Sequence, residues 1–306
     1  MRDILFSVPG APVQVESKFK RRMSFDLGSI GLGEVPLLEV FDVQRGTEGV
    51  RERRHKGALE ISYLASGWQN WNVAGQFYPV CGNDVLVKHP GDLHDTGDFP
   101  LGKGRSYSLQ LRFPVRGKPF LTLDAREAKP LTDALRTLPH RHFLGDARLR
   151  SLFEQIVLLL LSPERSPCTK LHVAHMLLEW LFIIVARGQV AKLSEITPDV
   201  QRVWDRINAN PSENPTMLEM AEMAGLSLTW FKEKFRQRAG MGPMECLMRS
   251  KVEMAKGLLM DPALSITEIA ARLGFSSSQY FATVFKRFYH KSPREFREQG
   301  EAGALP

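Results

Sequence analysis

The sequence has few cysteines, and the ones it has lie far apart. Three cysteines occur among 306 residues: Cys81, Cys168 and Cys246. An odd and widely spaced set lacks both the density of a disulfide framework and the close spacing of a zinc knuckle. We therefore expect a fold that depends on the packing of apolar side chains in a reducing compartment.

The sequence also lacks a secretion signal and a long uninterrupted apolar run. Its N-terminus shows no basic segment followed by a short apolar one. The most apolar stretch, Leu171–Val185, contains His172, His175 and Glu179, so we expect it to be too short and too polar to cross a bilayer. These features predict a cytoplasmic protein with no membrane partner.

Charge of one sign is in modest excess. The formal net charge is +7 and the sequence pI is about 9.4, which suits a polyanionic partner without proving one. Residues 198–299 hold 15 Lys and Arg against 12 Asp and Glu. Because that excess is small, an argument for nucleic-acid binding has to come from motifs.

Residues 265–297 carry the pattern of two short helices. Ser265 and Glu268 form a capping box, and Gly274 stands where the first apolar face ends. Ser276 and Gln279 predict a second capping box. The apolar face of the second helix is then formed by Phe281, Val284, Phe285 and Phe288. Two such helices joined by a tight turn are a helix-turn-helix, whose second helix can lie in the DNA major groove.

This stretch resembles the signature of the AraC/XylS family of bacterial transcription regulators. The matching residues are Ile269-Ala270, Gly274-Phe275-Ser276, Tyr280-Phe281, Phe285-Lys286-Arg287, Ser292-Pro293 and Phe296-Arg297. His290 departs from the family, which usually has glycine at this helix end; histidine tolerates the left-handed conformation at small cost. The resemblance implies double-stranded DNA as a partner, a homodimer, and RNA polymerase as a partner of an activator.

An internal repeat extends the pattern over residues 199–299. Gly225 corresponds to Gly274 at an offset of 49, and Phe235 to Phe285 at an offset of 50, so we expect one extra residue inside the second helix of the second copy. The first helix-turn-helix is expected at 216–239, where Thr216 and Glu219 predict a capping box. The joining helix is expected at 243–260 and the second helix-turn-helix at 265–289. A joining helix of about 27 Å would set the two reading helices into successive major grooves, about 34 Å apart.

The reading helices present polar side chains away from their apolar faces. The candidates for base contact are Thr229, Lys232, Glu233, Ser278, Gln279 and Thr283, because lysine can donate to guanine, glutamate can accept from cytosine and glutamine can pair with adenine. The candidates for phosphate contact are Arg236, Lys286, Arg287 and Lys291. The alternatives are a solvated charged face, and for Gln279 a capping role that needs no DNA.

The N-terminal part reads as a β-barrel over residues 1–125. Short apolar runs, the last of them Phe120–Leu123, alternate with turn clusters and are expected to be strands. Gly82–His94, in which a Pro-Gly turn precedes the final histidine, resembles the second half of a cupin barrel. The basic run Lys18–Arg22 is expected to be a solvated arm or an edge strand. Residues 126–190 form a helical connector, which either carries a dimer contact or packs as a plain hairpin on the barrel, and 191–198 form a linker. The fold class is α+β multidomain, with a cupin-like barrel or jelly roll before an all-α tandem helix-turn-helix.

A barrel of this kind is the sensory domain of AraC-type regulators. Trp68, Trp71, Tyr78 and His94 are the candidates for an effector pocket, and stacking of indole on sugar rings makes a sugar the expected effector. Trp68 and Trp71 are three apart, so only one of them should point inward. Core aromatics are the equally weighted alternative. Because no His-x-His pair precedes a glutamate at cupin spacing, we expect no metal and no cofactor.

These patterns together predict a one-component transcription regulator, with activation as the expected sign, and not an enzyme. Two alternatives remain. One is a cupin-type metalloenzyme with an appended DNA-binding module, which bound metal would indicate. The other is a ligand-independent regulator whose barrel only dimerises.

Overall fold

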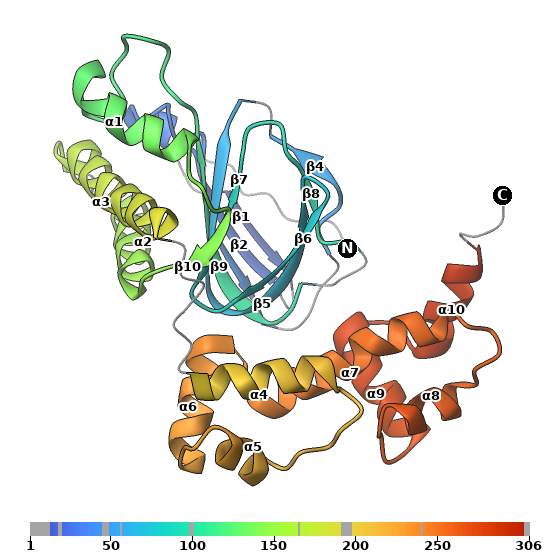
Figure 1. Cartoon of the computed structure of the whole chain (residues 1–306). Helices are drawn as coiled ribbons and strands as arrows, with labels where there is room; N and C mark the ends of the chain where they lie inside the picture. The colour runs from blue at the N-terminus through green and yellow to red at the C-terminus, as the bar shows by residue number, and fades with distance from the viewer. Residues whose placement is uncertain are drawn as a thin grey trace. The chain divides into compact units, whose positions relative to one another are not determined.

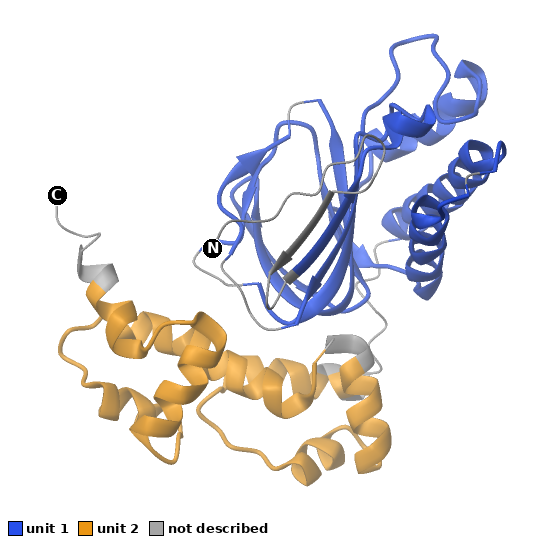
Figure 2. Ribbon diagram, turned by 180° about the vertical axis from the view of Figure 1, so that it is seen from behind, with its two compact units in different colours: residues 1–45, 49–194 blue, residues 46–48, 195–306 orange. Residues whose placement is uncertain are grey.

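The computed structural model describes residues 13–17, 20–44, 49–55, 57–97, 101–164, 166–190, 198–239 and 241–302. The chain divides into two compact units, coloured separately in Figure 2. The first unit comprises residues 1–45 and 49–194, and the second comprises 46–48 and 195–306. Each unit is described by itself. The proposed linker at 191–198 lies, apart from Pro198, outside the described residues.

The first unit is an antiparallel β-barrel with helices on one side (Figure 1). Its strands are β1 (Val13–Ser17), β2 (Lys20–Phe25), β3 (Leu37–Val43), β4 (Arg53–Arg54), β5 (Leu59–Val73), β6 (Gln76–Cys81), β7 (Asp84–Lys88), β8 (Leu93–Asp95), β9 (Gly104–Leu111) and β10 (His142–Leu144). One sheet has the order β1-β2-β3-β9-β5-β7-β10. The second half of β5 leaves that path and pairs with β6 and β8, and β8 pairs with β4.

The long strand β5 belongs to both sides of the barrel because it is bent at a bulge. The register of the β5–β9 pair shifts between Leu64 and Ser66. Gly67 follows with a φ of 90°, and a Cβ at this position would lie 2.1 Å from the carbonyl oxygen of Lys103. Only glycine fits this close approach, so the corner is fixed by local sequence.

Alternate residues of β5 face two different cores. Leu59, Ile61 and Tyr63 pack with the helices in one apolar cluster. Glu60 and Ser62 point the other way, into the barrel, as strand alternation requires. Further along the interior, Leu64 joins Trp71, Val73, Val80 and Leu86 in a second, smaller apolar cluster. The barrel interior is therefore apolar in one part and polar around Glu60.

Three helices cover the outer face of the larger sheet: α1 (Ala125–Arg136), α2 (Ala147–Leu161) and α3 (Thr169–Gln189). A capping box of Asp124 and Glu127 starts α1. On α2, Glu154 accepts a hydrogen bond of 2.7 Å from the hydroxyl of Tyr107 on β9. These helices share one core with the sheet, which favours the plain-hairpin interpretation of residues 126–190.

The prediction that the segment around Leu171–Val185 is too short and too polar to cross a bilayer was wrong. Helix α3 has 21 residues, and an 18-residue window within it has a mean hydropathy of 1.4, so the helix is long and apolar enough to cross a membrane by length and composition alone. However, 56% of that apolar window is buried in the unit, as in the core helix of a globular domain. No other helix in the described part of the chain passes this test.

The second unit contains seven helices over the described residues 198–239 and 241–302. They are α4 (Pro198–Ala209), α5 (Met217–Met223), α6 (Leu228–Ala239), α7 (Pro243–Leu259), α8 (Ile266–Arg272), α9 (Ser278–Tyr289) and α10 (Pro293–Ala302). Helices α5 and α6 form one helix-turn-helix, and α8 and α9 form the other. Both pairs pack against α7, a helix of 17 residues and so about 25 Å in length.

Four local predictions need correction. The extra residue of the second copy lies in the turn before α9 and not inside a helix, because α6 and α9 both have 12 residues. Ser277, not Ser276, caps α9, so Gln279 forms no capping box. Phe120–Leu123 is a turn closed by a single bridge. The strand β2 is flanked by β1 and β3, so the part of the basic run from Lys20 on lies inside the sheet. Residues 18 and 19 lie outside the described residues.

Candidate nucleic-acid interface and barrel interior

The recognition helix of the first copy buries one face and exposes the other. Phe231 and Phe235 are fully buried, one turn apart, with their rings 5.5 Å from each other. The candidate base-contact residues of this helix, Thr229, Lys232 and Glu233, are all exposed. The helix spans Leu228–Ala239, as the spacing of the phenylalanines predicts.

The second recognition helix repeats this arrangement fifty residues later. Phe281 and Phe285 are fully buried on α9, with their rings 5.7 Å apart. Gln279 and Thr283 are exposed and Ser278 is half-buried. Gln279 takes no part in capping, and its Oε1 accepts only a long hydrogen bond of 3.4 Å from the hydroxyl of Ser278. Adenine recognition would use this oxygen together with the amide nitrogen.

The basic candidates lie on the recognition helices, except Lys291, which follows the end of α9. Arg236, Lys286, Arg287 and Lys291 are all exposed. Arg287 donates a hydrogen bond of 3.2 Å from Nη2 to Oε1 of Glu245 in the first turn of α7. A phosphate at Arg287 would therefore compete with a surface ion pair, which is worth at most about 1 kcal/mol.

Sequence reasoning missed two exposed aromatic side chains at the start of these helices. Trp230 is 63% exposed and Tyr280 is 47% exposed. They occupy the same position in the two copies, because the helices are offset by 50 residues. A single exposed apolar side chain is ordinary on a protein surface, so the feature that marks these two is their recurrence at one position of both copies. Their equal position in the repeat was the signal that could have found them.

Hydrogen bonds connect the turn of the second helix-turn-helix, at Leu273 and Gly274, to α7 and to the first helix-turn-helix. Lys251 of α7 is fully buried, and its ammonium group donates a hydrogen bond to the carbonyl oxygen of Leu273 at the end of α8. Burial lowers the pKa of Lys251 to about 8. Asn214, in the loop before α5, donates a hydrogen bond of 2.7 Å to the carbonyl oxygen of Gly274. These contacts fix the second turn against both α7 and the first copy.

Caps and turn conformations hold the helix ends. The capping boxes of Thr216 with Glu219 and of Ser265 with Glu268 are formed as predicted. Gly274 has a φ of 68°. His290 ends α9 in the left-handed conformation with a φ of 60°, as expected of a residue at a glycine position.

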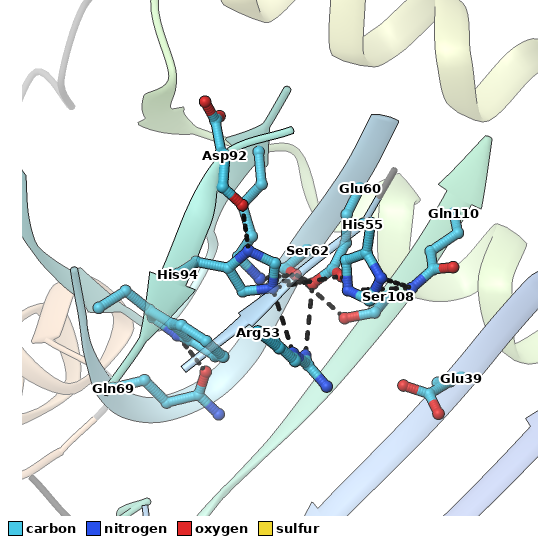
Figure 3. Close-up of polar contacts among 12 residues, drawn as sticks. Glu39, Arg53, His55, Glu60, Ser62, Gln69, Asp92, His94, Ser108 and Gln110 are labelled. Atoms are coloured by element: carbon cyan, nitrogen blue, oxygen red, sulfur yellow. Dashed lines mark hydrogen bonds and ion pairs between the residues drawn. The ribbon is translucent and has the colours of Figure 1, made fainter. Parts of the chain in front are cut away.

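The interior of the barrel holds a polar cluster built by strand register. Glu60 on β5 stands opposite Lys88 on β7 and opposite Gln110 on β9. Arg53 on β4 stands opposite His94 on β8. Figure 3 shows the labelled side chains from these strands directed toward one another. We name Arg53, His55, Glu60, Lys88 and His94 the interior cluster.

Glu60 is the centre of the interior cluster. Lys88 Nζ donates a hydrogen bond of 2.5 Å to Oε1 of Glu60, and Nε2 of His55 lies 2.7 Å from Oε2. Burial raises the pKa of Glu60, but Lys88, the hydrogen bond to His55 and Arg53 outweigh it and hold that pKa well below its usual value. Burial lowers the pKa of Lys88, and the charge of Glu60 partly offsets this.

His94 is held neutral by its surroundings. Burial and the nearby charge of Lys88 lower the pKa of His94 to about 4. Its Nε2 accepts a hydrogen bond of 3.1 Å from Nε of Arg53, and its Nδ1 donates to the carbonyl oxygen of Asp92 at 3.2 Å. Donation to Nε2 fixes the tautomer with the proton on Nδ1.

Of the four aromatic and histidine candidates, the structure brings two to the interior cluster. His94 belongs to it, and Trp71 lies with its ring 4.0 Å from Lys88 Nζ. Tyr78 stands opposite Trp71 in the β5–β6 pair and packs at the apolar part of the interior. Trp68 is on the other face of β5, so only Trp71 of the two tryptophans points inward.

Three members of the interior cluster are potential metal ligands. Ligand atoms of His55, Glu60 and His94 lie within 4.8 Å of one another. However, Lys88 and Arg53 already bond to the lone pairs of Glu60 Oε1 and His94 Nε2. Unit charges 4 Å apart interact by about 4 kcal/mol at an effective dielectric constant of 20, so these cations oppose a divalent ion. The residues do not fit a metal site, and the absence of a metal stays a prediction.

The second, helical unit matches a known domain family, and the chain is similar in sequence to known transcription regulators. The helix-turn-helix domain family matches residues 220–299. The transcriptional regulator AlkR of Acinetobacter baylyi is 26% identical over 217 residues, which cover 68% of this chain and 69% of AlkR. The transcriptional activator RhaS of Escherichia coli strain SE11 is 40% identical over 86 residues, covering 28% of this chain and under a third, 31%, of RhaS.

Among solved structures, ToxT of Vibrio cholerae is 12% identical and the match covers 85% of this chain and 97% of ToxT, with a TM-score of 0.34. The relatives named by sequence are transcription regulators and not enzymes. Residues 220–299, with their two helix-turn-helices, therefore form an AraC-type DNA-binding domain similar to that of transcription regulators such as AlkR and RhaS.

Proposed function

We propose that α6 and α9 read two segments of one operator and that a small molecule in the barrel controls the reading. The observation that carries this proposal is the matched pair of recognition helices, each with a buried phenylalanine face and an exposed polar face. Thr229, Lys232 and Glu233 in the first helix, and Ser278, Gln279 and Thr283 in the second, contact bases.

Phosphates are bound by Arg236, Lys286, Arg287 and Lys291, which position the helices without reading sequence. Trp230 and Tyr280, exposed in the first turns of α6 and α9, contact the sugar-phosphate backbone at the start of each helix. The contacts of Lys251 and Asn214 support this proposal, because reading two grooves together requires two helix-turn-helices held in a fixed relation.

The barrel is the sensory part, and a sugar is the proposed effector. The polar interior supports a ligand that makes several hydrogen bonds. It contains Ser62, Gln69, Ser108 and Gln110 (Figure 3), and Gln69 is hydrogen-bonded to the indole of Trp71. The ligand can act on DNA binding only through different affinities for two arrangements of the protein. We propose activation through RNA polymerase, a homodimer, and action in the bacterial cytoplasm.

The test is selection of binding sites from random duplex DNA by the full chain, followed by affinity measurements with and without a panel of monosaccharides. We expect one preferred site and a change in affinity of at least about fivefold with one sugar. A reporter carrying the selected site next to a weak promoter should then rise in expression. A fall would contradict activation, and no ligand effect would favour a barrel that only dimerises.

A further inference from the structure

With His55 neutral, since one of its ring nitrogens accepts a hydrogen bond from the amide of Gln110, the interior cluster and its neighbours carry one unbalanced positive charge. Lys88 and Glu60 form a pair whose sum is zero wherever their shared proton lies. Glu39, on β3, is also buried and is paired with Arg22 through a hydrogen bond of 2.7 Å from Nε to Oε1. Asp92 reaches the cluster only through its backbone oxygen, and its carboxylate is paired with Arg141. Among the residues that the structure describes, Arg53 is left with no carboxylate of its own.

Arg53 is also the member that a ligand can reach. Its side chain is 36% exposed, whereas those of Glu60, Lys88 and His94 are at most 2% exposed. Its Nε–H is used by His94. Its Nη2 stands 3.7 Å from Oε1 of Glu60, which is beyond hydrogen-bond range. Within the described residues, no hydrogen bond involves the two terminal nitrogens of this guanidinium.

We infer that the effector carries a carboxylate, which the two terminal nitrogens of Arg53 bind as a fork. Two parallel N–H groups match the two oxygens of a carboxylate, and such paired contacts are the strong ones. A single excess charge suits one carboxylate and not the double charge of a phosphate. This inference rests on the proposed function, because it names the ligand class of the same sensory site.

The surroundings define where the rest of the ligand lies. Trp71 presents an apolar ring, and the amide of Gln110 stands at the edge of His55. Gln69, whose Oε1 accepts a hydrogen bond from Trp71 at 2.9 Å, keeps an amide nitrogen for a second polar group. A sugar acid or another small acid with a flat or ring-shaped body fits this combination. A neutral sugar would leave the charge of Arg53 unmatched, and a divalent cation would add to it.

The experiment compares acids with their neutral counterparts on the full chain. Thermal shift and calorimetric titration use glucuronate against glucose, benzoate against benzyl alcohol and octanoate against octanol, at constant ionic strength. Manganese and zinc chloride form the metal arm. At a hundredfold excess over its Kd, a bound acid should raise Tm by a few degrees, and its neutral counterpart should not.

Variants assign the effect to Arg53. Arg53→Gln should weaken the acid about ten- to hundredfold. Arg54→Gln is the matched control, because Arg54 is the next residue on β4 and is exposed. The double variant Glu60→Gln/Lys88→Met keeps the excess charge and should retain acid binding, whereas it would abolish binding of a metal.

Four results would overturn the inference. The first is that an acid and its neutral counterpart bind equally tightly, and the second is that Arg53→Gln binds the acid as tightly as the wild type does. The third is saturable binding of one metal ion per chain that the double variant loses. The fourth is that no acid in the panel raises Tm. The failure of the proposed function looks different. A neutral sugar that binds and changes DNA affinity leaves the proposed function standing without the carboxylate. An acid that binds through Arg53 without changing DNA affinity confirms the site and contradicts its regulatory role.

Discussion

The ion pair of Lys88 with Glu60 predicts a large and specific loss of stability. Both side chains are buried, with 1% and 2% of their surfaces exposed. Replacing Lys88 by methionine keeps the length of the side chain and its contact with Trp71, but leaves the carboxylate of Glu60 in the barrel without its main partner. Removing one partner of a buried pair costs about 3–5 kcal/mol.

That loss can be converted into a melting temperature. For a unit of this size, 1 kcal/mol changes Tm by roughly 2–4 °C, so the transition of the first unit should fall by roughly 6–20 °C. The double variant Lys88→Met/Glu60→Gln should recover most of the loss, because it removes both charges together. Lys129→Met is the control, since its pair with Asp133 is exposed on α1 and should matter by about 0.5 kcal/mol or less.

Scanning calorimetry of the full chain is the assay, since the two units can melt in separate transitions. The four members of the double-mutant cycle give the coupling between Lys88 and Glu60 directly. A cost below about 1 kcal/mol for Lys88→Met, or a double variant no more stable than the single one, would refute the burial argument and the charge count of the interior cluster.

Three further predictions concern the reading unit and the pH response. Gly274→Ala should destabilise the second unit by at least about 2 kcal/mol in urea unfolding, because φ is 68° and the new Cβ would lie 2.5 Å from a backbone oxygen. The control is Gly242→Ala, which should not cause a loss of that size because the space around Gly242 is open. In binding assays on variant DNA sites, Lys232→Ala should change the base preference at one position by about 1–3 kcal/mol. Arg287→Ala should weaken binding to all sequences alike and reduce the slope of log affinity against log salt concentration by about one. If both variants bind DNA as tightly as the wild type, the reading faces are misassigned. The pKa of His94 in the folded protein is about 4, below its ordinary value of 6.5, so the neutral ring stabilises the fold above pH 6.5 and this contribution is lost as pH falls toward 4. His94→Gln should therefore reduce the fall in unfolding free energy between pH 6.5 and pH 4. An unchanged pH profile of the unfolding free energy would contradict the lowered pKa.

The helices of the reading unit could be predicted because their signals are local. Ser265 with Glu268, and Thr216 with Glu219, specify helix starts within four residues. The cap of α9 was misplaced by one residue because Ser276, Ser277 and Ser278 stand in a row, and any of them has the chemistry of an N-cap. Only the packing of the following phenylalanines decides between them.

The interior cluster could not be predicted from the sequence, because strand register depends on pairing between residues that are far apart in the chain. Glu60 and Lys88 are 28 residues apart and meet because β5 pairs with β7 in one register and not in its neighbour. His94 was identified from its place after a Pro-Gly turn. Its partner Arg53 was not, because an arginine in a charged stretch usually lies on a solvated surface.

The central claim is that one chain reads two segments of DNA with α6 and α9. The most direct measurement is the base preference of the full chain, determined by selection from random duplex DNA and repeated with the triple variants Thr229→Ala/Lys232→Ala/Glu233→Ala and Ser278→Ala/Gln279→Ala/Thr283→Ala. The account predicts two preferred segments whose centres are about 10 base pairs apart, each lost in one variant only. A single segment, or a preference that survives in both variants, would contradict it.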